Sequence, residues 1–123
     1  MKVSDFIAHL CEHTQYKGQM VHAEEIPARP AEYGTLAKPL PDPLQEILGE
    51  RALLPLYSHQ AQALNAIRNG QDVIVATGTA SGKTLCYNVP TLEAILEDEL
   101  SRALYLFPTK ALAQDQLRAL DEL

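Results

Sequence analysis

The chain has 123 residues, 46% of them hydrophobic and 21% charged, with a formal net charge of −6 at neutral pH. This composition is ordinary for a globular protein and argues against disorder throughout. The acidic balance argues against a general basic surface for nucleic acid but permits a narrow local contact. Because the sequence has no apolar run of membrane-spanning length and no signal-peptide pattern at its start, we expect a cytoplasmic protein.

The N-terminal region predicts a short helix followed by a long irregular segment. Ser4 is a suitable N-cap for an amphipathic helix whose apolar side carries Phe6, Ile7 and Leu10. Five of the eight prolines then fall between Pro27 and Pro43, and prolines at this density predict extended, irregular chain. We therefore expect residues 1–43 to be a helical and proline-rich lead-in to a domain at residues 44–123.

Two helices are expected before the first apolar strand. Asp42-Pro43 is a favourable start for one, and the other is expected to run from Ser58 to Gly70. With Ser58 as the N-cap of the second helix, Ala61 takes the N3 position, so no capping box is expected. The amide of Gln60 would then be free to bind another partner.

The central stretch of the chain has the order strand, tight loop, helix. The apolar run Val73–Ala76 is typical of a parallel strand covered on both faces. The loop that follows matches the phosphate-binding pattern G-x-x-x-x-G-K-[ST] at all but its first position. Such a loop turns backbone N–H groups toward phosphate oxygens. The expected nucleotide-binding residues of this loop are Thr77, Gly78, Thr79, Ala80, Ser81, Gly82, Lys83 and Thr84.

A second apolar strand, Ala103–Phe107, leads through Pro108, Thr109 and Lys110 into another helix. Strand and helix in alternation predict an α/β fold with a parallel sheet flanked by helices, and both loops then lie at the carboxyl edge where ligands bind. The free N–H groups of this last helix, with Thr109 and Lys110, could meet a nucleic-acid phosphate. Taken alone, the same residues are more simply a helix start capped by Thr109.

Three blocks together resemble motifs Q, I and Ia of superfamily 2 (DEAD/DEAH-box) helicases. They are Tyr57 to Gln60, Thr77 to Thr84 and Phe107 to Gln116, in that order. The longer segments Leu56 to Gln60, Ala76 to Pro90 and Ala103 to Gln116, with the lead-in from His22 to Arg29, are similar to RecQ-related repair helicases of the mitomycin repair factor A type. The resemblance implies a partial RecA-like P-loop NTPase lobe at the N-terminus of an ATP-dependent DNA helicase with a role in DNA repair. Its cofactors would be ATP and Mg²⁺, and its partner single-stranded or partly duplex DNA.

The resemblance also implies a role for each matching residue. Gln60 would read adenine, because a carboxamide can accept from N6–H and donate to N7 at once. Tyr57 would stack near the base. Lys83 would be the catalytic cation on the β- and γ-phosphates, and Thr84 would hold Mg²⁺. Pro108, Thr109 and Lys110 would contact the DNA backbone.

Two parts of such an enzyme are absent from the sequence. Hydrolysis needs an acidic pair at a strand end and an arginine from a second motor lobe, and the candidate pairs Asp98-Glu99 and Asp121-Glu122 lie near the ends of helical patterns. We therefore expect a truncated lobe that is inactive alone and exposes the apolar faces of its strands. Two alternatives stay open: another P-loop protein, such as a small kinase or regulatory module, or a non-catalytic ATP- or DNA-interaction protein.

Overall fold

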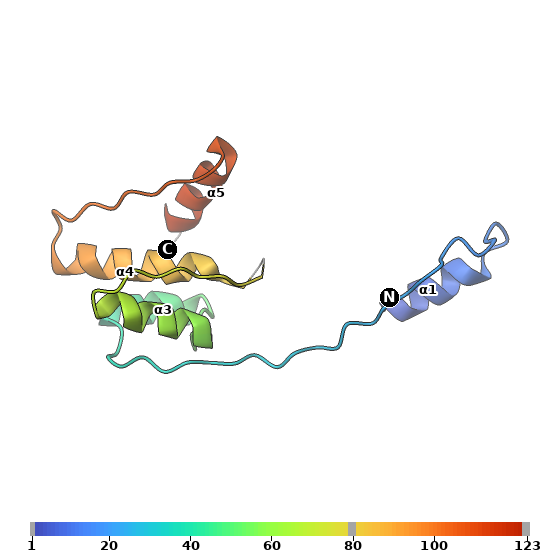
Figure 1. Ribbon diagram of the computed structural model, residues 1–123, viewed down its shortest axis with the longest axis horizontal. Coiled ribbons are helices and arrows are strands. Elements are labelled where there is room, and N and C mark those ends of the chain that lie inside the picture. Colours follow the sequence, from blue (N-terminus) through green and yellow to red (C-terminus); the bar gives the residue numbers. More distant parts are fainter. Residues whose placement is uncertain (1, 79–80, 122–123) are drawn as a thin grey trace. The chain divides into compact units, whose positions relative to one another are not determined.

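The computed structural model describes residues 2–78 and 81–121 (Figure 1). Contacts between residues divide the chain into two units, Met1–Pro30 and Ala31–Leu123. No helix among the described residues is long and apolar enough to cross a membrane. The helices of the described residues are α1 (Val3–Glu12), α2 (Asp42–Glu50), α3 (Ser58–Arg68), α4 (Lys83–Glu97) and α5 (Lys110–Asp121).

The first unit consists of α1 and the irregular chain that follows it. The helix begins at Val3, so the prediction of Ser4 as its N-cap is wrong. The backbone N–H of Lys2 instead donates to the carboxylate of Asp5 at 3.3 Å. A carboxylate in the first turn satisfies one of the free N–H groups there, which explains why the helix starts earlier. No residue of α1 is buried.

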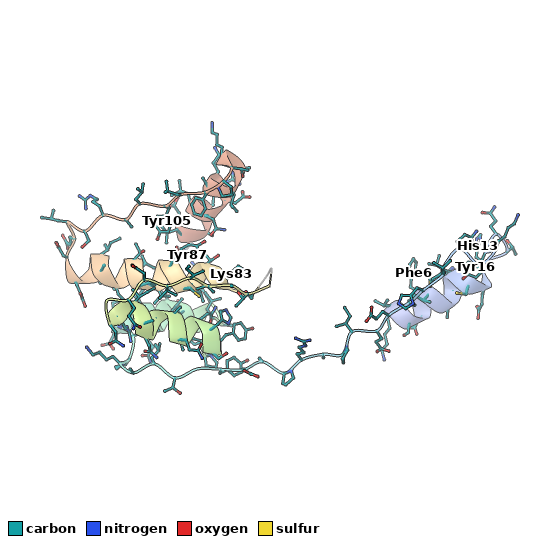
Figure 2. The ribbon with its side chains drawn as sticks, in the orientation of Figure 1. Phe6, His13, Tyr16, Lys83, Tyr87 and Tyr105 are labelled. Atoms are coloured by element: carbon teal, nitrogen blue, oxygen red, sulfur yellow. The ribbon has the colours of Figure 1, made fainter. Side chains whose placement is uncertain are left out.

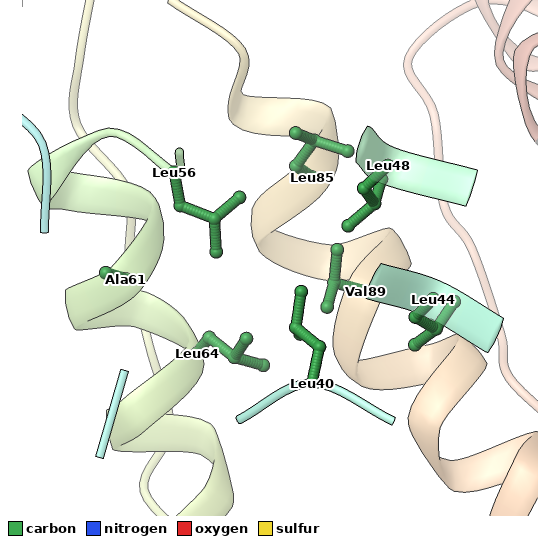
Figure 3. Packing of buried hydrophobic residues seen from close by; sticks show 8 residues of the cluster. All are labelled: Leu40, Leu44, Leu48, Leu56, Ala61, Leu64, Leu85 and Val89. Carbon is green, nitrogen blue, oxygen red and sulfur yellow. The ribbon is translucent and has the colours of Figure 1, made fainter. Parts of the chain in front are cut away.

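The core of the second unit is a cluster of leucines between α2, α3 and α4 (Figure 3). Its eight buried members are Leu40, Leu44, Leu48, Leu56, Ala61, Leu64, Leu85 and Val89. Leu40 precedes α2 and is only 6% exposed. The second unit, as defined by contacts, begins at Ala31 and so includes Leu40, whereas the sequence predicted a domain boundary after residue 43.

The segment before Leu40 is tied to the start of α3 by backbone pairing. Tyr33 and Tyr57 form an antiparallel bridge, in which the Gly34 N–H donates to the Leu56 carbonyl at 3.0 Å. A Cβ on Gly34 would lie 2.6 Å from the Cβ of Ala61. Only glycine allows the two backbones to approach this closely, so the lead-in is seated against α3 by residue size as well as by hydrogen bonds.

Helices α2 and α3 follow the sequence closely. Asp42 is the first residue of α2 and Pro41 its N-cap, one residue before the N-cap that the Asp-Pro pair predicted. Helix α3 ends at Arg68, just before Gly70 in the left-handed conformation at φ 74°. The N-cap of α3 is Tyr57, one residue before the expected Ser58. This shift places Gln60 at the N3 position of α3.

The predicted parallel sheet is not confirmed, because no β-strand is assigned within residues 2–78 and 81–121. The two apolar segments expected to be strands do not pair with each other. Their apolar side chains are largely exposed, as expected for strands without neighbours: Ile74 is 96% exposed, Leu104 85% and Leu106 83%. A parallel strand needs partners on its edges for its N–H and C=O groups, and this part of the chain offers none.

Candidate nucleotide-binding site

The side chain of Lys83, at the start of α4 (Figure 2), bonds to residues of the expected phosphate loop, Thr77–Thr84. Lys83 is the first residue of α4 and is half-buried. Its Nζ donates to the carbonyl oxygen of Thr77 at 3.1 Å and to that of Gly78, and it lies 3.4 Å from Ser81 Oγ. Within the described residues, three oxygen atoms of the loop thus lie close to the ammonium group. Thr79 and Ala80 lie outside the described residues.

Gly82 is the turning point between this loop and α4. Its φ is 74°, a left-handed conformation that residues with a side chain rarely adopt. A Cβ at this position would also lie 2.5 Å from Nε2 of Gln60. Both the backbone conformation and the lack of space therefore demand glycine here.

Gln60 connects the start of α3 to the phosphate loop, which corrects the expectation that its amide is free. Its Oε1 accepts from the Tyr57 N–H at 2.8 Å, which closes the N-terminus of α3 from the N3 position. Its Nε2 donates to the carbonyl oxygen of Gly82 at 2.9 Å. Because a carboxamide has two acceptor sites and two N–H groups, each end retains one hydrogen-bonding site. The side chain is therefore fixed in place, with one acceptor site and one N–H group not used by these two bonds.

A cavity of about 400 Å³ lies beside the phosphate loop. Four of the residues expected at the nucleotide site line it: Tyr57, Gln60, Gly82 and Thr84. Ten further residues line it, and those with polar side chains are Tyr33, Arg51, Asn88 and Gln116. Tyr33 stacks on Tyr57 with ring centroids 5.6 Å apart. The sequence could not indicate Tyr33, because it lies in the irregular lead-in. It could indicate Gln116, which is the last residue of the third motif block.

The hydroxyl of Thr84, the expected Mg²⁺ ligand, is hydrogen-bonded across the cavity. It donates to Oε1 of Gln116 on α5 at 3.3 Å. The same Oε1 accepts from the hydroxyl of Tyr87 at 2.7 Å. A threonine hydroxyl has one proton and two lone pairs, so this donation leaves its oxygen able to bind a cation. The donor set is thus compatible with a hard metal ion bound together with phosphate.

Burial makes the one cysteine near this site unreactive. Cys86 lies on α4 and is 4% exposed. Desolvation raises the pKa of its thiol, and a backbone hydrogen bond and the charge of Lys83 only partly oppose that shift. Because the thiolate is the nucleophilic form of cysteine, burial and this shift both lower the reactivity of the thiol.

The residues expected to contact DNA lie at the start of α5, apart from the cavity. Pro108, Thr109 and Lys110 are exposed, and none of them lines it. The hydroxyl of Thr109 accepts from the Leu112 N–H at 3.3 Å, so Thr109 does act as a helix cap. Lys110, the first residue of α5, is exposed to solvent.

Comparison with known proteins assigns the family. Residues 57–123 match the model of the DEAD/DEAH box helicase family, which is more than half of the 123 residues. The chain therefore belongs to the DEAD/DEAH box helicases. The match begins at Tyr57, so it contains all three motif blocks and confirms the resemblance that they indicated.

Individual relatives agree with this assignment. The chain is 44% identical over 104 residues to the uncharacterized ATP-dependent helicase YprA of Bacillus subtilis, a match that covers 85% of this chain and 14% of YprA. It is 41% identical over 121 residues to the ATP-dependent helicase hrq1 of Schizosaccharomyces pombe, with 96% of this chain and 11% of hrq1 covered. The chain thus spans a small fraction of the length of these relatives.

Solved structures extend the likeness to three dimensions. Crystal structures of the DUF1998 helicase MrfA bound to DNA, without and with AMPPNP, match this chain with TM-scores of 0.81 and 0.78. The sequence identity is 39%, and the match covers 99% of this chain and 17% of MrfA. The chain thus has the fold of the corresponding part of a helicase with a RecA-like motor.

Proposed function

We propose that this chain supplies the ATP-binding loop and part of the DNA contact of an ATP-dependent DNA helicase. The observation that carries the proposal is the cavity of about 400 Å³ beside the phosphate loop, with Gln60, Gly82 and Thr84 in its wall. The printed names of the relatives, which are ATP-dependent helicases, support it. MrfA was crystallised with DNA and AMPPNP, an ATP analogue, which supports ATP and DNA as the ligands of this chain also.

The nucleotide would lie with its base in the cavity and its phosphates in the loop. Tyr57, 41% exposed and stacked on Tyr33, offers a ring surface for the base. Gln60 would use its two remaining hydrogen-bonding sites on adenine. The phosphates would displace the loop carbonyls from Lys83, since a charge-assisted contact is the stronger one. Mg²⁺, held through the phosphates and Thr84, would neutralise charge on the outer phosphates.

The DNA contact would be made at the start of α5 by Pro108, Thr109 and Lys110. The ammonium group of Lys110 would bind a phosphate of single-stranded or partly duplex DNA, assisted by the N–H groups of the first helical turn. In the longer enzyme, the apolar segments 73–76 and 103–107 would join a parallel sheet. DNA repair is the process we propose for that enzyme.

The test pairs two lysine substitutions with two ligands. Thermal melting of the full chain is measured with and without AMPPNP and Mg²⁺, and binding of a fluorescent single-stranded oligonucleotide is measured separately. At 100 times its Kd, AMPPNP should stabilise the chain by about 2.7 kcal/mol. Lys83→Ala should abolish that shift and leave oligonucleotide binding unchanged. Lys110→Ala should weaken oligonucleotide binding and reduce its salt dependence by about one phosphate contact, without changing the nucleotide shift.

Either of two results would contradict the proposal. If AMPPNP at saturating concentration does not change the melting temperature of the unsubstituted chain, the cavity is not a nucleotide site. If Lys83→Ala and Lys110→Ala affect both ligands equally, the two contacts are not separate.

A further inference from the structure

We infer that Gln116 is a positioning residue for the metal-binding hydroxyl of Thr84, and that it joins the nucleotide site to α5. This inference rests on the proposed function, because it assigns Gln116 a role in Mg²⁺-dependent nucleotide binding. It starts from a contact between residues far apart in the sequence. Gln116 and Thr84 are 32 positions apart, on α5 and α4, yet the Thr84 hydroxyl donates to Gln116 Oε1 at 3.3 Å.

The geometry determines the direction of the threonine proton. An ionised carboxylate or a carboxamide oxygen can only accept, so the hydrogen bond between Thr84 and Gln116 uses the one proton of the hydroxyl. The lone pairs of Thr84 Oγ1 are then all that it can offer to another partner, and the Tyr87 hydroxyl lies 3.5 Å from this oxygen as a weak donor. A cation needs lone pairs and is repelled by a proton, so a hydroxyl whose proton already points at Gln116 is prepared for Mg²⁺.

Tyr87 keeps the amide of Gln116 in place. Its hydroxyl donates to Gln116 Oε1 at 2.7 Å, the shorter of the two bonds that this oxygen accepts. The ring of Tyr87 is held in turn by an edge contact with Tyr105, with ring centroids 5.8 Å apart (Figure 2). Tyr105 donates through its hydroxyl to Oδ1 of Asn88 at 3.3 Å. Gln116 and Tyr87 are thus hydrogen-bonded to each other beside Thr84, and Tyr105 supports the ring of Tyr87.

The same group connects two regions that the proposed function assigns to different ligands. Thr84 is the second residue of α4, next to the phosphate loop. Gln116 lies on α5, whose first residue is Lys110 and whose N-terminus is capped by Thr109. A cation bound at Thr84 would strengthen the donation to Gln116, because coordination makes a hydroxyl proton more acidic. The position of α5, and with it the DNA contact, would then respond to the metal-bound nucleotide.

The test measures how much Mg²⁺ improves nucleotide binding. The Kd of AMPPNP for the full chain is determined in Mg²⁺ and in excess EDTA, for the unsubstituted chain and for Gln116→Leu. Leucine keeps the side-chain volume but removes the acceptor. We expect Kd in Mg²⁺ to rise by about 3- to 10-fold and Kd in EDTA to change by less than about twofold, since one hydrogen bond to the ligating hydroxyl is lost.

Two further variants make the test specific. Tyr87→Phe removes the 2.7 Å hydrogen bond but keeps the ring against Tyr105. Because it acts through Gln116, its effect and that of Gln116→Leu should not add in the double variant. Gln62→Leu makes the same chemical change at an exposed position of α3 and is the matched control, with both Kd values unchanged. Melting without ligand confirms that each variant folds.

The outcomes separate this inference from the proposed function. Equal loss of affinity in Mg²⁺ and EDTA, or no change in either, would overturn the role of Gln116 while nucleotide binding itself stands. Additive effects of Tyr87→Phe and Gln116→Leu would overturn the shared pathway. If the unsubstituted chain does not bind AMPPNP, the proposed function fails and this inference fails with it.

Discussion

The side chain of Gln60 shows how one residue can serve the fold and the candidate site together. It is 3% exposed and hydrogen-bonded both to the Tyr57 N–H and to the Gly82 carbonyl. A glutamine held at both ends of its amide cannot rotate to exchange its oxygen and nitrogen. In the role that we propose for it, its orientation would be set before a base arrives, so less ordering entropy would be lost on binding.

We expect Gln60 to determine the preference of the candidate site for ATP over GTP. Gln60→Ala should reduce the ratio of GTP to ATP dissociation constants toward one, because the remaining sites on the amide match adenine and not guanine. It should also destabilise the chain by about 1–3 kcal/mol, since the Tyr57 N–H and the Gly82 carbonyl lose their partner. Competition binding with both nucleotides and thermal melting measure the two effects. An unchanged GTP-to-ATP ratio would refute base reading, whatever the loss of stability.

Helix α2 ends in a recognised capping motif with an unusual residue in it. The N–H of Leu53 donates to the Leu48 carbonyl at 2.9 Å and that of Ala52 to the Gly49 carbonyl at 3.0 Å. This is the bond pattern of a Schellman motif, in which the C′ residue adopts a left-handed conformation. Here that residue is Ala52, with φ at 54°, where helices commonly have glycine.

We expect the substitution Ala52→Gly to stabilise the chain. A left-handed alanine costs roughly 1–2 kcal/mol, and the greater freedom of glycine in the unfolded state offsets about half of that. We expect a net gain of about 0.5–1 kcal/mol in the free energy of unfolding, measured by urea denaturation without nucleotide. Ala94→Gly, within α4 and exposed, is the control and should lose about 1 kcal/mol. A loss for both variants would show that Ala52 is not strained.

For the whole molecule, the important feature is apolar surface that no helix covers. Leu104 and Leu106 are 85% and 83% exposed, in the segment between α4 and α5. Exposed apolar strand segments pair with other chains. We expect the chain to associate as its concentration rises, and the double variant Leu104→Gln, Leu106→Gln to weaken association by at least about tenfold, given 1.5–3 kcal/mol per buried leucine.

Sedimentation velocity over a range of concentrations measures this prediction. Val21→Gln is the control, because Val21 is 94% exposed but lies in the irregular part of the first unit. It should leave association unchanged. If the chain is monomeric at all concentrations, these leucines do not mediate association. If Val21→Gln has an equal effect, the segment 103–107 is not the surface responsible for it.

Features formed by a few consecutive residues could be predicted from the sequence alone. The turn at Gly82 and the cap at Thr109 are properties of a few consecutive residues, and the structure has both. The nucleotide roles of Lys83 and Thr84 stay predictions. The helices from Asp42, Ser58 and Lys83 follow from periodicity and end signals for the same reason. The motif order also sufficed to indicate the helicase family.

Other features depend on residues far apart in the chain, and the tertiary structure alone decided them. The pairing of Tyr33 with Tyr57, the bond from Gln60 to Gly82 and the bond from Thr84 to Gln116 bring together segments that no local pattern relates. The sheet stays an unconfirmed prediction for the described residues, because strands, unlike helices, satisfy their backbone groups only on partner strands. Helices and loops were therefore determined by sequence, whereas the walls of the cavity were determined by packing.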